Sequence, residues 1–342
     1  MSSSIHSGLI ILFFVFTIFS VSNAAVVEKT QPTALIFPVR KYTEALQSGV
    51  YPCNSCIQYY TTLNISKQDN NINLAMDLGG QHTWFSCDDF DIPTYKSISC
   101  NTEKCRKYKG YDCMNCALLI PVPPRCINNG CAVTYANQFA AQDINNSLAE
   151  DALFVESTNG VSVGLTYKSP EPFPFSCSDL LDNLASGTKG MIGLVNTTTS
   201  LPAHMSSQFN LPHKFALCLP SSPIHGHISQ EDERVDGPLD MCFNATDIPK
   251  SKTGPAVPHI DIGFAGGKNE CRLYGANSML SVNEEVLCLA FVDGGKFPRT
   301  SVVIGAHQLE NYLIEFDLVS SKVGTSSSLL TRNATCSQSR VL

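Results

Sequence analysis

The stretch that decides the fold is Asn73-Leu74-Ala75-Met76-Asp77-Leu78-Gly79-Gly80-Gln81-His82-Thr83-Trp84-Phe85. An apolar run leads into Asp77, the pair Gly79-Gly80 turns the backbone, and a second apolar run follows with Trp84, the single tryptophan of the chain. This order predicts two strands joined by a glycine turn that carries a carboxylate. Such a carboxylate can activate a water molecule when a second carboxylate lies beside it.

The composition is that of a large β protein rather than a disordered chain. The 342 residues are 43% hydrophobic and 15% charged, which is enough apolar material for one large core or two smaller ones. The formal net charge is −7, and the sequence has no run of Lys or Arg. This balance argues against nucleic acid or an anionic membrane as a partner.

The N-terminus has the pattern of a secretion signal. Residues 9–21 are almost entirely apolar, and Ser22-Asn23-Ala24 follows with small residues at the two positions that a signal peptidase reads. The run is shorter than the roughly 20 residues needed to cross a bilayer. We therefore expect a signal peptide over residues 1–24 and a secreted mature chain that begins at Ala25.

Cysteines and glycosylation motifs agree with this expectation. Fifteen cysteines in a secreted chain predict disulfides. The candidates are Cys87, Cys100, Cys105, Cys113, Cys116, Cys126, Cys131, Cys177, Cys218, Cys242, Cys288 and Cys336, while the roles of Cys53, Cys56 and Cys271 stay open. Five Asn-x-Ser/Thr motifs predict solvent-facing glycosylation sites at Asn64, Asn145, Asn196, Asn244 and Asn333.

Three patterns suggest chemistry that the context does not support. The pairs Cys53/Cys56 and Cys113/Cys116 are 56 residues apart, whereas a zinc ribbon needs about 15–20. His225 and His227 lack nearby carboxylates, so we expect a loop there and no metal or cofactor. The GxSxG pattern that begins at Gly160 is followed by a proline-rich segment that cannot form the helix of a hydrolase elbow, and we expect a hairpin turn.

Local patterns also predict individual elements. Residues 57–65 are β-branched and aromatic and predict a strand, Asp69-Asn70-Asn71 predicts a turn, and residues 201–209 predict a short helix. The glycines of the segment Gly190-Met191-Ile192-Gly193 are spaced for close approach of two backbones.

Longer segments carry a family resemblance. They are Asp77 to Gly80, Gly190 to Gly193, Lys214 to Cys218, Gly254 to Pro258, Val286 to Gly295 and Pro298 to Gly305. Together they resemble the plant pseudo-protease branch of the pepsin fold, which includes xylanase inhibitors, xyloglucan-endoglucanase inhibitors and basic globulins. The resemblance implies an all-β, bilobal, pepsin-like fold with an N-terminal lobe over residues 25–228 and a C-terminal lobe over residues 229–342.

The chain departs from that pattern in its second lobe. Residues 25–228 supply 204 residues for the first lobe, but residues 235–342 supply only 108 for a second lobe of similar expected size. About a hundred residues, the size of a small domain, are absent near residues 229–234. We expect this truncated lobe to be the less stable one and to expose Ile260, Ile262 and Phe264.

The catalytic apparatus is also incomplete. The resemblance implies a Thr after the catalytic aspartate and a Ser two residues beyond it, but this chain has Leu78 and Gly80. The missing segment would hold the second aspartate, and no Asp-Thr-Gly or Asp-Ser-Gly occurs in the chain. Asp293-Gly294-Gly295 lies in a family segment distant from the active aspartates. We expect Asp77 to be vestigial and the protein to be no enzyme.

Tyr135 takes the place of the flap tyrosine of active members of the fold. Its neighbours Ala136-Asn137-Gln138 replace the flap glycines, so we expect Tyr135 to serve packing rather than substrate contact.

The resemblance implies a function and a contact surface. Inhibitors of this group place cations of two loops between the catalytic carboxylates of a glycosidase. Those loop positions are held here by Lys252 and Arg332, which can equally be ordinary solvated cations. The resemblance also implies the disulfides Cys242–Cys288 and Cys218–Cys336.

We therefore expect a monomeric inhibitor, secreted to the plant cell wall, whose partner is an endoglucanase or xylanase. Two alternatives stay open: an aspartic endopeptidase, and a degenerate or misassembled family member without function.

Overall fold

The computed structural model describes residues 31–43, 57–140, 142–222, 239, 241–263, 270–294 and 302–337. The chain divides into two units, Met1–Gln31 and Pro32–Leu342, and the helices and strands below belong to the second. The expected signal peptide, Cys53, Cys56, His225, His227 and the expected seam at 229–234 lie outside the described residues.

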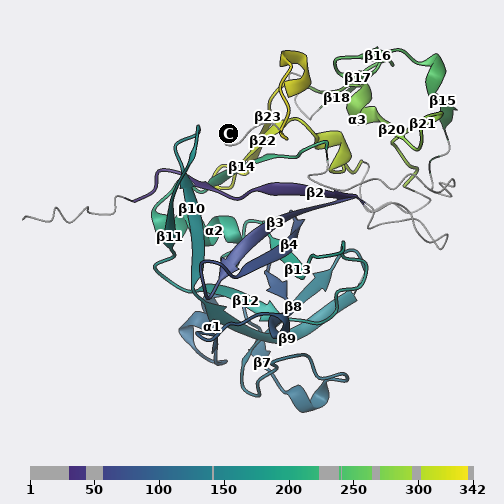
Figure 1. Cartoon of the computed structure of the whole chain (residues 1–342). Helices are drawn as coiled ribbons and strands as arrows, with labels where there is room; N and C mark the ends of the chain where they lie inside the picture. The colour runs from purple at the N-terminus through teal and green to yellow at the C-terminus, as the bar shows by residue number, and fades with distance from the viewer. Residues whose placement is uncertain are drawn as a thin grey trace, which may run out of the picture. The chain divides into compact units, whose positions relative to one another are not determined.

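The first part of this unit is organised around one 13-stranded sheet (Figure 1). Its main path runs β1-β10-β3-β4-β13-β5-β12-β9-β8-β7, while β2 pairs with β3, β11 with β10 and β6 with β9. The strands are β1 Leu35–Ile36, β2 Val39–Thr43, β3 Ile57–Ile65, β4 Asn71–Asp77, β5 Trp84–Phe85, β6 Lys96–Ser97, β7 Asp112–Cys113, β8 Cys131–Asn137, β9 Gln142–Asp151, β10 Leu153–Thr158, β11 Val163–Lys168, β12 Phe173–Cys177 and β13 Gly190–Gly193.

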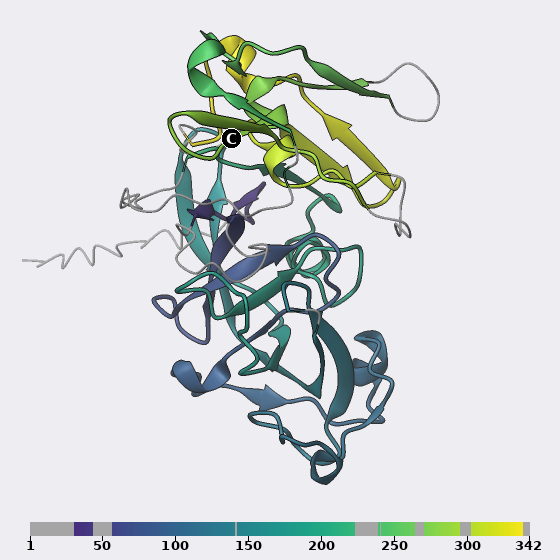
Figure 2. The same ribbon diagram turned by 90° about the vertical axis from the view of Figure 1, so that its right-hand side faces the viewer.

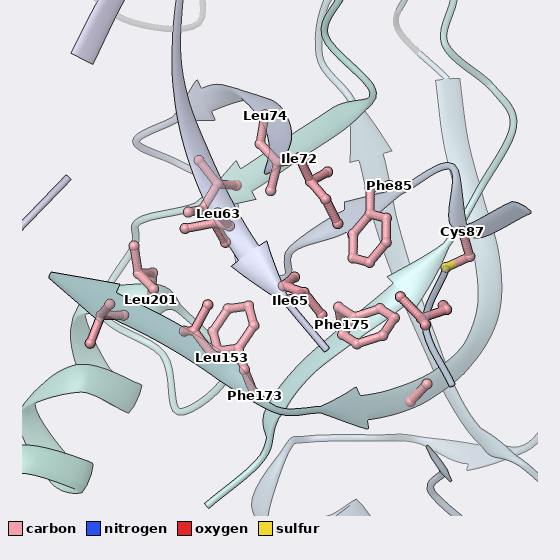
Figure 3. Packing of buried hydrophobic residues seen from close by; sticks show 14 of the residues in the cluster. Leu63, Ile65, Ile72, Leu74, Phe85, Cys87, Leu153, Phe173, Phe175 and Leu201 are labelled. Atoms are coloured by element: carbon pink, nitrogen blue, oxygen red, sulfur yellow. The ribbon is translucent and has the colours of Figure 1, made fainter. Parts of the chain in front are cut away.

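The core of this sheet follows from alternation along its strands. Leu63 and Ile65 of β3 and Ile72 and Leu74 of β4 are fully buried on one face, where they meet the aromatic rings of β5 and β12 (Figure 3). The Phe85 and Phe175 rings lie 4.6 Å apart between centroids. Each such side chain contributes about 1.5–3 kcal/mol on burial, which makes this cluster the main support of the sheet.

Several local predictions are confirmed. The predicted strand over residues 57–65 is β3, and the predicted helix over residues 201–209 is α2, Leu201–Phe209. The GxSxG segment contains the turn between the antiparallel strands β10 and β11, as expected for a hairpin. The remaining helices are α1 Glu103–Lys107 and α3 Gly275–Ser278, with short 3-10 turns η1 Cys87–Asp89, η2 Cys116–Leu118, η3 Ala245–Asp247, η4 His307–Leu309 and η5 Leu329–Arg332.

Among its described residues, the C-terminal part forms small sheets, shown in green and yellow in Figure 2. Two have three strands, in the orders β14-β22-β23 and β15-β21-β20, and two are the pairs β16-β17 and β18-β19. The strands are β14 Lys214–Cys218, β15 Cys242–Asn244, β16 Lys250–Ser251, β17 Gly254–Pro255, β18 Ile260–Gly263, β19 Glu270–Leu273, β20 Met279–Ser281, β21 Val286–Leu289, β22 Leu313–Asp317 and β23 Lys322–Thr325.

This second lobe has a small core of its own. Ile260 and Ile262 were expected to be exposed, but both are half-buried against a cluster that includes Leu273, Tyr312 and Ile314. Pairing of β18 with β19 brings them there. Phe264 lies outside the described residues. The sheet β14-β22-β23 takes its strands from both sides of the expected lobe boundary.

Six disulfides join twelve cysteines of the described residues. They are Cys87–Cys177, Cys100–Cys113, Cys105–Cys131, Cys116–Cys126, Cys218–Cys336 and Cys242–Cys288. Cys271 is a buried free thiol, and burial raises its pKa. In the part of the chain that the structure describes, no helix is long and apolar enough to span a membrane.

Candidate functional site: the Asp77 turn and the Lys252 and Arg332 loops

Asp77 ends β4, but the strand beside it is not the one that the sequence suggested. Instead of a simple hairpin of β4 and β5, the structure inserts β13 between them. β13 is parallel to β4, with Gly193 opposite Asp77, and antiparallel to β5, with Met191 opposite Trp84.

Glycines make this insertion possible. A Cβ atom at Gly190 would lie 2.0 Å from the Trp84 carbonyl oxygen, and one at Gly193 would lie 2.6 Å from the Gly80 carbonyl oxygen. Any side chain at either position would push β13 out of the sheet. The expected close approach of backbones at these glycines is confirmed.

The Asp77 carboxyl is held by its own turn. Its Oδ1 accepts a hydrogen bond of 2.9 Å from the Gly79 N–H. A Cβ atom at Gly80 would lie 2.7 Å from Oδ2, so the carboxyl fills the space that a side chain at position 80 would need. Burial raises the pKa of Asp77 above its ordinary value, and the N–H groups of Gly79 and Gly80 oppose this rise. Within the described part of the chain, no second carboxylate contributes to this change in the pKa of Asp77.

The hairpin of β8 and β9 is fixed by internal packing. The buried Tyr135 ring stacks on Trp84 with centroids 5.8 Å apart, and its hydroxyl donates to the Cys177 carbonyl at 2.9 Å. The Asn137 side chain donates to the carbonyls of Leu180 and Asp182 at 3.2 and 2.9 Å. Tyr135 therefore serves packing, as the sequence predicted.

The two predicted contact cations lie on neighbouring loops. Lys252 is in the turn between β16 and β17, and its Nζ donates a hydrogen bond of 3.0 Å to the main-chain carbonyl of Thr331. Gly254 closes that turn at φ 94°, where a Cβ atom would lie 2.3 Å from the Ala276 nitrogen. Thr331 belongs to η5, which ends at Arg332. We call Lys252, Thr331 and Arg332 the cation surface.

Arg332 projects from a well-anchored segment. Cys336, four residues on, is bonded to Cys218, and its N–H donates to the Asn311 side chain at 3.0 Å. The Leu329 N–H donates to the Asn311 carbonyl at 2.8 Å. Arg332 itself is exposed, and its side chain makes no ion pair or hydrogen bond with the described residues. The guanidinium thus extends from a backbone segment that the disulfide and these hydrogen bonds anchor.

Sequence reasoning missed a buried ion pair that ties the two parts of the unit together. Lys41 of β2 donates to Glu310 Oε1 at 2.7 Å, and the Tyr59 hydroxyl donates to the same oxygen. His307 Nδ1 lies 3.7 Å from Glu310 Oε2. Burial alone would raise the pKa of Glu310, but His307, Lys41 and Tyr59 outweigh it and lower the pKa. No local sequence signal marks Glu310 as buried.

The predicted glycosylation sites differ in exposure. Asn145, Asn196, Asn244 and Asn333 are exposed. Asn64 is half-buried near the C-terminal end of β3, which departs from the expectation that all five face solvent. The reason is that β3 is an interior strand, paired with β10 and β4 at this position.

The β fold and an aspartate at a glycine turn at the end of β4 are typical of a pepsin-like protein. Models of the xylanase inhibitor N-terminal and C-terminal families match residues 59–229 and 223–327. The chain belongs to the xylanase-inhibitor family of aspartic protease-like proteins.

Named relatives and solved structures agree with this assignment. The chain is 30% identical to gamma conglutin 1 of Prunus dulcis, with 77% of this chain and 81% of that protein covered. A crystal structure of edgp matches with a TM-score of 0.75 and 28% identity, over 90% of this chain and 98% of that one. Conglutin gamma from lupine seeds shares the fold, with a TM-score of 0.73 and 23% identity over 90% of this chain and 98% of that one.

A further relative bears on the truncated lobe. The chain is 29% identical to the probable aspartic proteinase GIP2 of Nicotiana benthamiana over 415 positions, with 90% of this chain and 91% of that protein covered. This span exceeds the 342 residues of the chain. The relative therefore has stretches without a counterpart in this chain.

Proposed function

We propose that the protein is a secreted, catalytically inactive aspartic protease homologue that inhibits a glycoside hydrolase of the plant cell wall, an endoglucanase or a xylanase. The observation that carries the proposal is the hydrogen bond from Lys252 to Thr331, which brings two loop cations onto one surface. Membership of the xylanase-inhibitor family supports the class of partner. The six disulfides fit an extracellular, apoplastic protein.

The chemistry of glycosidases suits this surface. Their two catalytic carboxylates lie about 5–10 Å apart in an open cleft. Arg332 offers a planar fork that can bind one carboxylate through two hydrogen bonds. Lys252 supplies a compact charge, and one of its three donors is already directed to Thr331. In this proposal Arg332 enters the cleft and Lys252 holds the loop and adds positive charge beside it.

The Asp77 turn supports the loss of catalysis. A pepsin-type reaction needs two carboxylates that share a proton. The Asp77 Oδ1 accepts a hydrogen bond from the Gly79 N–H, and neither Leu78 nor Gly80 has a hydroxyl to offer the carboxyl. The hydroxyl of Tyr135, at the position of the flap tyrosine, donates a hydrogen bond to the Cys177 carbonyl.

Two observations favour a second candidate, an aspartic endopeptidase. Asp77 is retained with a raised pKa, and one relative is named a probable aspartic proteinase. A single preparation of the secreted protein separates the candidates. We expect it to lower the activity of a xyloglucan-degrading endoglucanase or a xylanase and to leave casein intact at acid pH. Pepstatin-sensitive cleavage of casein would favour the endopeptidase, and the absence of both effects would indicate a member without function.

A further inference from the structure

A polar cavity of about 430 Å³ lies over the outer face of the β2-β3-β4 sheet region. Its floor consists of side chains that alternate with the core residues of β3 and β4, and β1 and β10 contribute to its wall. The volume lies in the roughly 300–1,000 Å³ range of small-molecule sites. We call it the β3 pocket. It is lined by Phe37, Arg40, Tyr60, Thr62, Asn64 and Asn73, among others.

The floor of the β3 pocket is a chain of hydrogen bonds. Arg40 donates to the Thr62 hydroxyl at 2.9 Å, and that hydroxyl donates to the Asn73 Oδ1 at 2.8 Å. Phe37 and Tyr60 add aromatic surface. Amide, guanidinium and hydroxyl groups beside aromatic rings suit a ligand with many hydroxyls and some apolar C–H surface. This is the chemistry of a sugar residue.

One lining residue belongs to a motif for N-linked glycosylation. Asn64 is the acceptor of the motif Asn64-Ile65-Ser66. In the described part of the chain its Oδ1 is buried without a hydrogen-bond partner, although the residue lines the pocket. The same geometry points to Nδ2, the atom that is glycosylated, as the polar end of the side chain that is open to the cavity.

The folded motif is closed to the enzyme that attaches glycans. Asn64 pairs with Phe154 of β10 and with Asn71 of β4 in the middle of the sheet. Ser66 is 9% exposed, and its hydroxyl lies 3.1 Å from the Thr94 hydroxyl. Attachment must therefore precede formation of the sheet, and any glycan on Asn64 must find its place when β3 folds.

We propose that the β3 pocket is an intramolecular glycan site, in which the first sugar residue of an N-linked glycan on Asn64 packs against Tyr60 and Phe37. The inference rests on passage of the chain through the secretory pathway, as proposed above. The asparagines of the other four motifs are exposed, so a glycan on any of them would extend into solvent. The chain thus supplies its own matched controls.

The test is site-resolved release of glycans from the native protein. The full chain is secreted from mammalian cells, treated with peptide-N-glycosidase F before and after denaturation, and mapped by peptide mass spectrometry. We expect Asn64 to be glycosylated and its glycan to be released from the native protein on the order of tenfold more slowly than that of Asn333, because release requires local opening. After denaturation the two rates should converge.

A pocket variant provides the second measurement. In Arg40→Ala/Phe37→Ala the Asn64 glycan should become as sensitive as that of Asn333, while release at Asn145 stays unchanged. Equal release at Asn64 and Asn333 in the native wild type would overturn the inference. If Asn64 is unmodified while the exposed sites carry glycans, the pocket inference is wrong but the proposed secretion stands. If none of the five sites carries a glycan, the proposed secretion is wrong as well.

Discussion

The ε-amino group of Lys252 lies 3.0 Å from the main-chain carbonyl oxygen of Thr331, to which it donates a hydrogen bond. The two residues are 79 positions apart, and the residue after Thr331 is the exposed Arg332. Such a bond is worth only about 0.5–1.5 kcal/mol, so its main consequence is positional. It fixes a second cation next to the one that we expect to enter a glycosidase cleft.

The two cations should contribute unequally to inhibition. We expect Arg332→Ala to weaken inhibition by about 2–5 kcal/mol, because it leaves the partner's carboxylate buried without its charge, and Lys252→Ala to weaken it by less. Arg332→Lys should recover only part of the loss, because an ammonium cannot form the bidentate contact. Inhibition constants against one endoglucanase measure both effects.

Lys168→Ala is the control for general loss of positive charge, since Lys168 is an exposed cation on β11 in the other part of the unit. Unchanged inhibition in the double variant Lys252→Ala/Arg332→Ala would rule out the cation surface.

Restoring the family pattern around Asp77 should not restore proteolysis. In Leu78→Thr/Gly80→Ser, the side chain added at position 80 displaces Asp77 Oδ2, because a Cβ atom there lies 2.7 Å from it. The turn regains its hydroxyls, but the sequence contains no Asp-Thr-Gly or Asp-Ser-Gly that would supply the second carboxylate. We expect no casein cleavage at acid pH from the wild type or this variant. Cleavage that disappears in Asp77→Asn would show that Asp77 has a partner after all.

The buried pair of Lys41 and Glu310 should make the fold sensitive to acid. Because the folded pKa of Glu310 is lowered, the folded state binds fewer protons there than the unfolded state, whose pKa is near the ordinary glutamate value of 4.5. The contribution is complete above that value and is lost as the pH falls through the lower folded pKa.

The corresponding variant is Glu310→Gln. At neutral pH it should cost about 3–5 kcal/mol, since Lys41 stays buried without its charge partner. The difference from wild type should shrink as the pH falls below the ordinary glutamate value. Glu315→Gln is the matched control, since Glu315 is exposed on the neighbouring β22 and pairs with an exposed Lys214. Denaturant unfolding at several pH values measures both, and a constant difference for Glu310→Gln would contradict the assignment.

The Cys218–Cys336 disulfide should be the more stabilising of two that can be compared directly. It closes a segment of 118 residues, against 10 for Cys116–Cys126. Chain entropy gives about 4–5 kcal/mol for the long loop and about 3 kcal/mol for the short one. We expect Cys218→Ala/Cys336→Ala to unfold at lower denaturant concentration than Cys116→Ala/Cys126→Ala. The reverse order would show that the tail is held by packing rather than by the disulfide.

Local patterns predicted what depends on neighbours in sequence. The alternation of residues 57–65 gives β3 with its bounds, and the pattern of residues 201–209 gives α2. The glycine turn after Asp77 was also predicted correctly, but the insertion of β13 between β4 and β5 was not. That arrangement depends on β13, which lies more than a hundred residues further along the chain. Its glycines predicted close approach to another backbone, but they did not show that the neighbours would be β4 and β5.

The same limit applies to the candidate site. Lys252 and Arg332 were proposed from resemblance, and only the fold shows that their loops meet at Thr331. Nothing near Glu310 in sequence indicates that a carboxylate is buried against Lys41. The half-buried state of Asn64 could have been anticipated, since its motif lies inside a predicted strand, and neighbouring strands can cover such a residue on either face.

The measurement that tests the central claim most directly is a titration of a xyloglucan-degrading endoglucanase, and in parallel a xylanase, with the purified secreted protein. We predict that the residual activity of one enzyme falls to a plateau at one equivalent of inhibitor, and that Arg332→Ala shifts the curve to higher concentration. Full enzyme activity at a large excess of the wild-type protein would contradict the claim that this pepsin-like chain is a glycosidase inhibitor.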